Sequence, residues 1–110
     1  MFIFKNKVVL VTGGANGIGQ CIADEFRNQG AIVYVIDKQE GEHFVGDISK
    51  KEILEAFAVE VMSKHNKVDI IINNALPLMK GIDECSYEEF QYALSVGVTA
   101  PFYLVKLLKN

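Results

Sequence analysis

The chain has 110 residues, half of them apolar, and its 14 acidic and 11 basic side chains give a formal net charge of −3. A chain of this length forms at most one domain, and the acidic balance speaks against a nucleic-acid-binding surface, which needs clustered Lys and Arg. No apolar run approaches the roughly 18 residues that span a bilayer, so we also expect no membrane partner.

Four short apolar segments have the composition of β-strands. Residues 7–11 form a β-branched run that ends at a glycine cluster, and residues 31–37 are apolar on both faces, as in a parallel strand covered on each side. Residues 68–73 form a further buried strand, whereas residues 43–45 form a brief strand at most. These four segments are the expected sheet.

Segments of helical periodicity lie between and after these strands. The first begins in the glycine cluster. A second is expected at Ser49, because Ser49 and Glu52 have the spacing of a capping box, and a third at the equivalent pair Ser86 and Glu89. A last apolar helix is expected over residues 99–109.

The alternation of strand and helix predicts an α/β fold with a parallel sheet. Right-handed crossovers and Rossmann winding give the strand order 3-2-1-4, with flanking helices, in a single dinucleotide-binding unit over residues 1–110. Only residues 38–42 separate the second and third strands, although a parallel crossover usually takes a dozen or more residues. Either a bare loop replaces the helix there, or the third strand is vestigial.

The glycine cluster, TGGANGIG at residues 12–19, lies between the first strand and the first helix. Glycine is needed there for separate reasons: Gly13 permits a tight turn, Gly17 lets backbone N–H groups approach a pyrophosphate, and Gly19 permits close packing of helix and strand. The helix N-terminus then faces the phosphates. Asp37, 18 residues after Gly19, has the spacing of a carboxylate that binds the adenosine ribose. The pattern predicts dinucleotide binding, the alternative being that Asp37 is a solvated strand-end residue.

Three motifs in order resemble the short-chain dehydrogenase/reductase family: TGxxxGxG at residues 12–19, GDI at 46–48 and NNA at 73–75. The resemblance implies that the side chain of Asp47 and the backbone of Ile48 contact the adenine ring. It also implies that Asn74 and Ala75 stabilise the sheet and line the adenosine ribose. The expected cofactor-binding residues are Gly13, Asn16, Gly17, Ile18, Gly19, Asp37, Asp47, Ile48, Asn74 and Ala75.

The expected cofactor is NAD. Asp37 would repel the 2′-phosphate of NADP, and Asn16 stands where phosphate-binding relatives often carry a basic residue. Lys38 is a hint in the other direction, to which we give little weight. The family implies hydride transfer between nicotinamide and a carbonyl or secondary alcohol.

The chain departs from the family in three places. Leu76 replaces a glycine, and Gly97 replaces the catalytic Asn, although glycine permits the same break in the helix. In the family, the catalytic Ser and Tyr-x-x-x-Lys lie on a fifth strand and on the helix after it. We expect both of these elements to follow Asn110, so that the sheet predicted here is truncated before strand five. Tyr34 and Lys38 have the right spacing on the wrong element, because four residues span about 6 Å on a helix but roughly 13 Å along a strand. We therefore expect no catalytic residue in this chain. Our first hypothesis is that it is the N-terminal portion of an NAD-dependent short-chain oxidoreductase. The alternatives are a non-catalytic nucleotide-binding or partner-binding module and a subunit completed by another chain.

The remaining expectations concern the environment of the protein. Cys21 and Cys85 form no CxxC motif and have no nearby histidine pair, so we expect no metal site and a cytoplasmic protein with reduced thiols. His43 and His65 are expected at the surface or at a strand edge, and not in a catalytic role. The strand at 68–73 would be an unpaired sheet edge, and the last helix has little polar surface at Phe102, Val105, Leu107 and Leu108. A homo-oligomer through that edge, that helix or both is expected.

Overall fold

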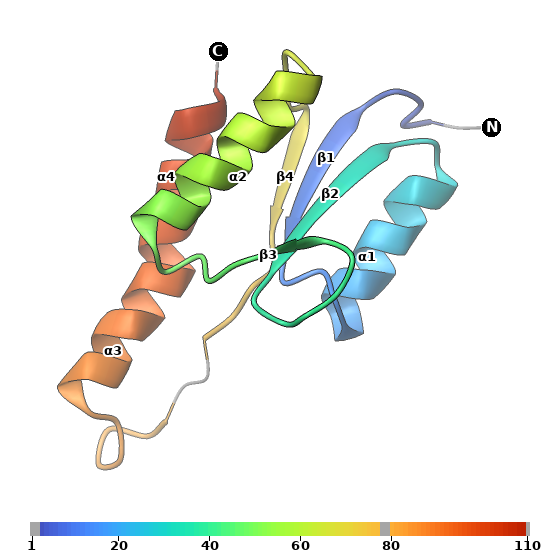
Figure 1. The fold of residues 1–110 in the computed structure, drawn as a ribbon. Coiled ribbons are helices and arrows are strands. Elements are labelled where there is room, and N and C mark those ends of the chain that lie inside the picture. The colour runs from blue at the N-terminus through green and yellow to red at the C-terminus, as the bar shows by residue number, and fades with distance from the viewer. Residues whose placement is uncertain (1–2, 78–79, 110) are drawn as a thin grey trace.

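The computed structural model describes residues 3–77 and 80–109, and it contains one parallel sheet (Figure 1). The sheet has four strands in the order β3-β2-β1-β4, which confirms the predicted order. The strands are β1 (Val8–Thr12), β2 (Ile32–Asp37), β3 (Phe44–Val45) and β4 (Ile70–Asn73). Within the described residues β4 is an edge strand, since it pairs with β1 alone.

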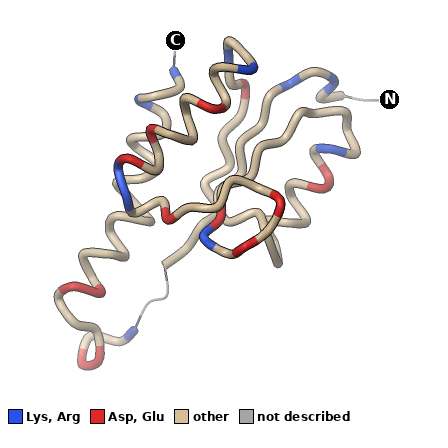
Figure 2. The backbone as a smooth tube through the Cα atoms, in the orientation of Figure 1, with Lys and Arg blue, Asp and Glu red and all other residues tan. Residues whose placement is uncertain are grey.

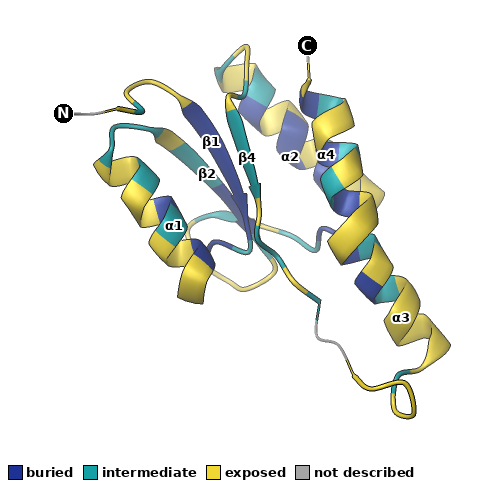
Figure 3. Ribbon diagram, turned by 180° about the vertical axis from the view of Figure 1, so that it is seen from behind, coloured by how far each residue is buried: buried dark blue, intermediate teal, exposed yellow. Residues whose placement is uncertain are grey.

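The helices are α1 (Gly17–Asn28), α2 (Lys51–Lys64), α3 (Tyr87–Leu94), the π-helix η1 (Ser95–Thr99) and α4 (Ala100–Leu108). Helix α1 covers one face of the sheet, whereas α2 and α4 lie side by side over the other face (Figures 1 and 3). Such a three-layer arrangement follows from right-handed crossovers between parallel strands. No helix in the described part of the chain is long and apolar enough to cross a membrane.

The core has two halves because β1, buried along its whole length, sends alternate side chains to opposite faces. Val8 and Leu10 belong to the half under α2 and α4, together with the fully buried Phe57 of α2. Val9 and Val11 belong to the smaller half under α1. Burial on both faces explains why the central strand is apolar from Val8 to Val11, with Thr12 as its one polar residue.

The start of α2 corrects one prediction. The helix begins at Lys51, with Lys50 as N-cap and no side-chain cap, so the expected capping box of Ser49 and Glu52 does not form. Instead, the backbone N–H of Ser49 donates to Asp47 Oδ1 at 2.9 Å, which draws Ser49 into the turn that precedes the helix. The competing local hydrogen bond to Asp47 moves the N-cap by one residue, from Ser49 to Lys50.

The last helix corrects a second point. The α-helix is interrupted at Gly97, but not broken: the chain runs from α3 through the π-helix η1 directly into α4. A π-turn accommodates one extra residue within a continuous helix, by bonds such as that from Ala100 N–H to the Ser95 carbonyl. The inward face of α4 is buried at Leu104 and Leu108, so Leu108 contributes to the core and not to the exposed face that the sequence suggested.

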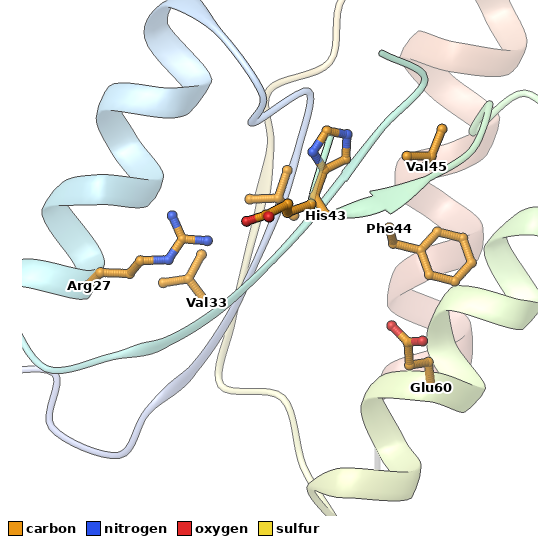
Figure 4. A pocket seen from close by; sticks show the side chains of 8 residues that line it. Arg27, Val33, His43, Phe44, Val45 and Glu60 are labelled. Atoms are coloured by element: carbon orange, nitrogen blue, oxygen red, sulfur yellow. The ribbon is translucent and has the colours of Figure 1, made fainter. Parts of the chain in front are cut away.

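The short connection between β2 and β3 is a loop, and β3 has only two residues, so both alternatives offered for this region hold. With no crossover helix there, Val33 and Val35 of β2 line an open pocket of about 420 Å³ on the α1 side of the sheet. Arg27 of α1 and Glu60 of α2 reach it from either side, and His43 lies at the loop (Figure 4). None of the lining residues belongs to the glycine cluster, so this pocket lies outside the predicted nucleotide site.

Candidate functional site

The predicted site lies where β1, β2 and β4 end, and its glycines have separate steric roles. Gly13 and Gly17 adopt φ of +68° and +54°, a region that side chains disfavour. A Cβ on Gly19 would lie 2.2 Å from the Gly13 carbonyl oxygen and 2.4 Å from Asn74 Nδ2, so only glycine fits there. A Cβ on Gly17 would meet no atom within 4 Å. The loop is therefore closed on the Gly19 side and open at Gly17.

The N-terminus of α1 is free of the groups that usually cap a helix. In the described structure its N-cap, Asn16, makes no side-chain cap bond, and the first turn carries no acidic residue. The Asn16 amide instead donates to Gln39 Oε1 at 2.6 Å, and Ile18 is exposed. The unsatisfied N–H groups and positive end of the helix dipole suit an anion, so this open loop fits the pyrophosphate of a dinucleotide.

Asp37 is held against the glycine loop by backbone donors. The Ala15 N–H donates to Asp37 Oδ2 at 3.1 Å, and the Gln39 N–H donates to Oδ1 at 3.0 Å. Two hydrogen bonds leave the carboxylate with further acceptor capacity. A half-buried carboxylate is thus fixed beside the open helix N-terminus.

Asn74 and Ala75 are joined to the same loop through Thr12, whose side chain is almost fully buried. Thr12 Oγ1 accepts from the N–H groups of Asn74 and Ala75, at 3.1 and 3.0 Å. The Asn74 amide donates in turn to the carbonyls of Thr12 and Gly13, at 3.2 and 3.0 Å. These bonds fix the end of β4 against the glycine loop, which gives Asn74 a structural role there.

Asp47 follows β3, beside the end of β2. Tyr92 of α3 donates its hydroxyl to both carboxylate oxygens, at 3.1 and 3.2 Å. Burial alone would raise the pKa of Asp47, but hydrogen bonds from Ser49 and Tyr92 and the charge of Lys38 outweigh it and hold the pKa below its usual value. Ile48 turns its side chain into the core, where it is 7% exposed.

Two of the departures from the family pattern, Leu76 and Gly97, lie at positions that are not crowded by neighbouring atoms. Leu76 is exposed and fills no space within the described core. A Cβ on Gly97 would lie 3.9 Å from the nearest atom, Pro77 Cδ, so a side chain is tolerated there. Neither position is held by the packing that constrains Gly19.

Sequence reasoning missed three residues that organise the site. Thr12 could have been found, because a Thr before the first glycine of the loop ends a buried strand and must satisfy its hydroxyl. Gln39 and Tyr92 gave no signal: Gln39 lies in a loop of unpredictable path, and Tyr92 comes to Asp47 from a helix 45 residues away.

The chain matches the short chain dehydrogenase family model over residues 7–110. It is 32% identical to mouse (Mus musculus) L-fucose dehydrogenase, across 94% of this chain and 43% of that protein. The chain belongs to the short-chain dehydrogenase family, whose members here are oxidoreductases with a nucleotide-binding Rossmann fold. It spans less than half the length of this curated relative.

Solved structures agree with the fold. A 3-ketoacyl-(acyl-carrier-protein) reductase from Brucella melitensis, complexed with NADH, superposes with a TM-score of 0.83 and 28% identity over 94% of this chain and 48% of that one. A metagenomic short-chain oxidoreductase in complex with NADP gives a TM-score of 0.85 at 24% identity, over 96% and 55% of the two chains. Both nicotinamide dinucleotides thus occur among structures with this fold.

Proposed function

We propose that this chain is the NAD-binding portion of an oxidoreductase that moves hydride between nicotinamide and a carbonyl or secondary alcohol. The observation that carries the proposal is the Asp37 carboxylate, fixed by the N–H groups of Ala15 and Gln39 beside the uncapped start of α1. A carboxylate there accepts from the two adenosine ribose hydroxyls and repels a 2′-phosphate. Bound NAD would supply the hydride acceptor, and NADH the donor.

The other predicted residues would each bind a different part of the dinucleotide. The open backbone of Gly17 and the α1 N-terminus, with Gly13, Asn16, Ile18 and Gly19, would hold the pyrophosphate. Asp47 and the backbone of Ile48 would meet the adenine ring. Asn74 and Ala75 would line the ribose while they brace the loop. Each lies at the carboxyl end of the parallel strands, where ligands bind in open α/β sheets.

The position of Lys38 supports NAD over NADP. Its ammonium lies 5.6 Å from the centroid of the Tyr92 ring, and its charge acts on Asp47. The one cation that follows Asp37 directly in sequence is therefore engaged on the adenine side of the proposed site. A 2′-phosphate would meet Asp37 without a dedicated positive partner.

Titration of the protein with NAD(H) and NADP(H) tests this assignment. We expect NAD(H) to bind more tightly, and Asp37→Ser to lose about 1.5–3 kcal/mol of NAD binding, the contribution typical of hydrogen bonds to a charged group. Glu40→Ser is the matched control, because it removes an exposed negative charge from the same loop without touching the ribose site. Equal affinity of the wild type for the two cofactors would refute the assignment.

We also propose that a polypeptide of residues 1–110 alone binds NAD without turning it over. No Tyr on a helix among these residues has a Lys four positions later, and Tyr34 of β2 shares a 2.7 Å hydrogen bond with His65. Without a positioned proton donor, acid/base catalysis worth roughly 10²–10⁴ in rate is missing. Sustained NADH oxidation on a panel of alcohols and ketones, with contaminants excluded by mass spectrometry, would show that other groups supply the proton.

Self-association is proposed for two surfaces. Strand β4 is a half-buried edge, and Leu94, Val98, Phe102 and Val105 form an exposed apolar face along the α3, η1 and α4 helix, visible in part as yellow in Figure 3. Bare edges and apolar faces pair with further chains.

Sedimentation at micromolar concentration tests the assembly. We expect a dimer or larger species that Phe102→Asp shifts toward monomer, whereas Ile82→Asp, at a 94% exposed loop position, leaves it unchanged. A single monomeric species in which the amides of residues 70–72 exchange slowly would contradict this proposal.

Charge and thiols support the remaining expectations. Lys and Arg are scattered over the described chain and do not gather on one face (Figure 2), so we propose no nucleic-acid partner. Cys21 and Cys85 are free thiols, which suits the reducing environment of the cytoplasm that we propose for this protein.

A further inference from the structure

The side chain of Tyr92 joins the proposed adenine end of the site from a separate layer of the fold. Its hydroxyl lies 3.1 Å from Asp47 Oδ1 and 3.2 Å from Oδ2, so a single proton is shared between both oxygens. The Ser49 N–H donates to Oδ1 at 2.9 Å. The carboxylate is thereby fixed in rotation by donors from its own turn and from α3.

Lys38 completes this arrangement. Its ammonium lies 5.6 Å from the centroid of the Tyr92 ring, a cation–π distance. The end of β2, the turn after β3 and helix α3 therefore meet at one carboxylate. The hydroxyl, the Ser49 amide and the Lys38 charge all favour the ionised form of Asp47 over its protonated form.

We propose that Tyr92 is a positioning residue that presents the Asp47 carboxylate as an acceptor for the 6-amino group of adenine. This inference rests on the proposed function, in which Asp47 meets the adenine ring. A carboxylate has about four acceptor directions, and Tyr92 with Ser49 leaves part of that capacity unused. A fixed, ionised acceptor selects a purine with a donor at position 6 and rejects one with a carbonyl there.

The test compares NAD with nicotinamide hypoxanthine dinucleotide, in which a carbonyl replaces the 6-amino group. We expect wild-type protein to bind NAD at least roughly tenfold more tightly, as for a hydrogen bond to a charged group. In Tyr92→Phe, which keeps the ring under Lys38, NAD affinity should fall roughly fivefold, as for the loss of one hydrogen bond, while hypoxanthine binding stays within about twofold. Discrimination between the two ligands therefore shrinks.

Two variants sharpen the result. Tyr87→Phe removes a hydroxyl from an exposed ring on the same helix and should leave both affinities unchanged. Asp47→Asn removes the charge itself, and it should lose discrimination at least as far as Tyr92→Phe. Thermal unfolding of each variant verifies that the proteins compared are folded.

The outcomes separate this inference from the proposed function. Discrimination that Tyr92→Phe leaves intact, or an equal loss for both dinucleotides, overturns the positioning role while NAD binding itself stands. Wild-type protein that binds neither dinucleotide overturns the proposed function and the inference together. Reduced discrimination in Tyr92→Phe and Asp47→Asn, but not in Tyr87→Phe, supports it.

Discussion

Helices α1 and α3 begin in opposite ways, although every helix N-terminus has the same unsatisfied N–H groups. At α3, Ser86 Oγ accepts from the Glu89 N–H and Glu89 Oε1 accepts from the Ser86 N–H, each at 3.0 Å. Two acidic residues lie in that first turn. At α1, the described structure shows neither a side-chain cap nor an acidic residue in the first turn.

The difference shows that the N–H groups at the start of α3 are satisfied by its own side chains, whereas those at the start of α1 are not within the described residues. A side-chain cap is typically worth about 1 kcal/mol, and α3 obtains it from its own residues. Helix α1 forgoes that stabilisation, and glycines bring its backbone to an open surface. A local rule broken in this way, beside a fixed carboxylate, is expected at a functional site. The start of α1, which in the described part of the chain has neither a side-chain cap nor a first-turn acidic residue, therefore supports the nucleotide site that Asp37 indicates.

The largest expected effect on stability comes from adding a side chain at Gly19, in the loop at the start of α1. Gly19→Ala places a methyl group 2.2 Å from the Gly13 carbonyl oxygen, so backbone must move. We expect a loss of roughly 1–3 kcal/mol in the free energy of unfolding, as for other overpacked sites, and loss of NAD binding. Chemical denaturation and NAD titration measure the two effects.

Gly97→Ala is the matched control in the helix that follows α3. Its added methyl group meets no atom from outside its own helix closer than 3.9 Å, so the higher helix propensity of Ala should raise stability by about 0.5–1 kcal/mol. If both substitutions cost the same, the steric account of Gly19 is wrong.

The second effect concerns the brace under the loop. Asn74→Ala removes the donors to the Thr12 and Gly13 carbonyls, so we expect a loss of about 1–2 kcal/mol in stability. Asn73→Ala, at the exposed end of β4, should change stability far less. An equal cost at the two neighbouring positions would mean that the Asn74 bonds do not hold the loop.

Several features of the fold were predictable from the sequence, and those at the starts of α1 and α3 depend on residues that are close together in the chain. The glycine loop before α1 and the Ser86 capping box of α3 each follow from residues within one turn, whereas the strand order follows from right-handed crossovers and Rossmann winding. The Ser49 box failed because Asp47, two residues earlier, competes for the same backbone. A spacing rule cannot register such competition.

The parts that could not be predicted depend on long-range placement. Nothing near Tyr92 in sequence indicates Asp47, and the pairing arises only when the fold brings α3 to the turn after β3. The π-helix at residues 95–99 also had no signal in the sequence, where Gly97 indicated only that a break in the helix was permitted. Tertiary contacts decide these features.

A third, smaller effect uses charge to distinguish the two helix starts. Ile18 in α1 and Tyr87 in α3 are each 75% exposed in a first turn. A Glu at either position should stabilise its helix by about 0.3–1 kcal/mol through the helix dipole. Only Ile18→Glu should weaken NAD binding. Repulsion between the new carboxylate and each of the two phosphate charges costs about 0.8 kcal/mol at about 5 Å in water, so the affinity should fall roughly tenfold.

Opposite signs for stability and binding at Ile18, with a stability gain alone at Tyr87, would support the anion site at α1. Thermal unfolding and NAD titration of the two variants give both quantities. Unchanged NAD affinity in Ile18→Glu would place the pyrophosphate elsewhere.

The smallest effect is the pH response of the α3 start. A hydrogen bond from Lys80 and the Ser86 N–H lower the pKa of Glu89 from its usual value of 4.5 to about 2. A carboxyl group whose pKa is lowered on folding stabilises the fold fully above its unfolded pKa, and the contribution is lost as pH falls. The first turn of α3 should therefore loosen between pH 4.5 and about 2. Amide exchange at residues 87–90 measures this.

Glu89→Gln provides the control for that titration, because Gln keeps the capping acceptor for the Ser86 N–H but carries no titrating group. We expect its α3 start to be slightly weaker at neutral pH, since the 2.6 Å ion pair with Lys80 is lost, and to show no transition in the same acid range. The α1 start, where no first-turn carboxylate lies among the described residues, should show no such response in either protein. Equal acid sensitivity of both helix starts would remove the distinction between a capped helix and one left open for a ligand.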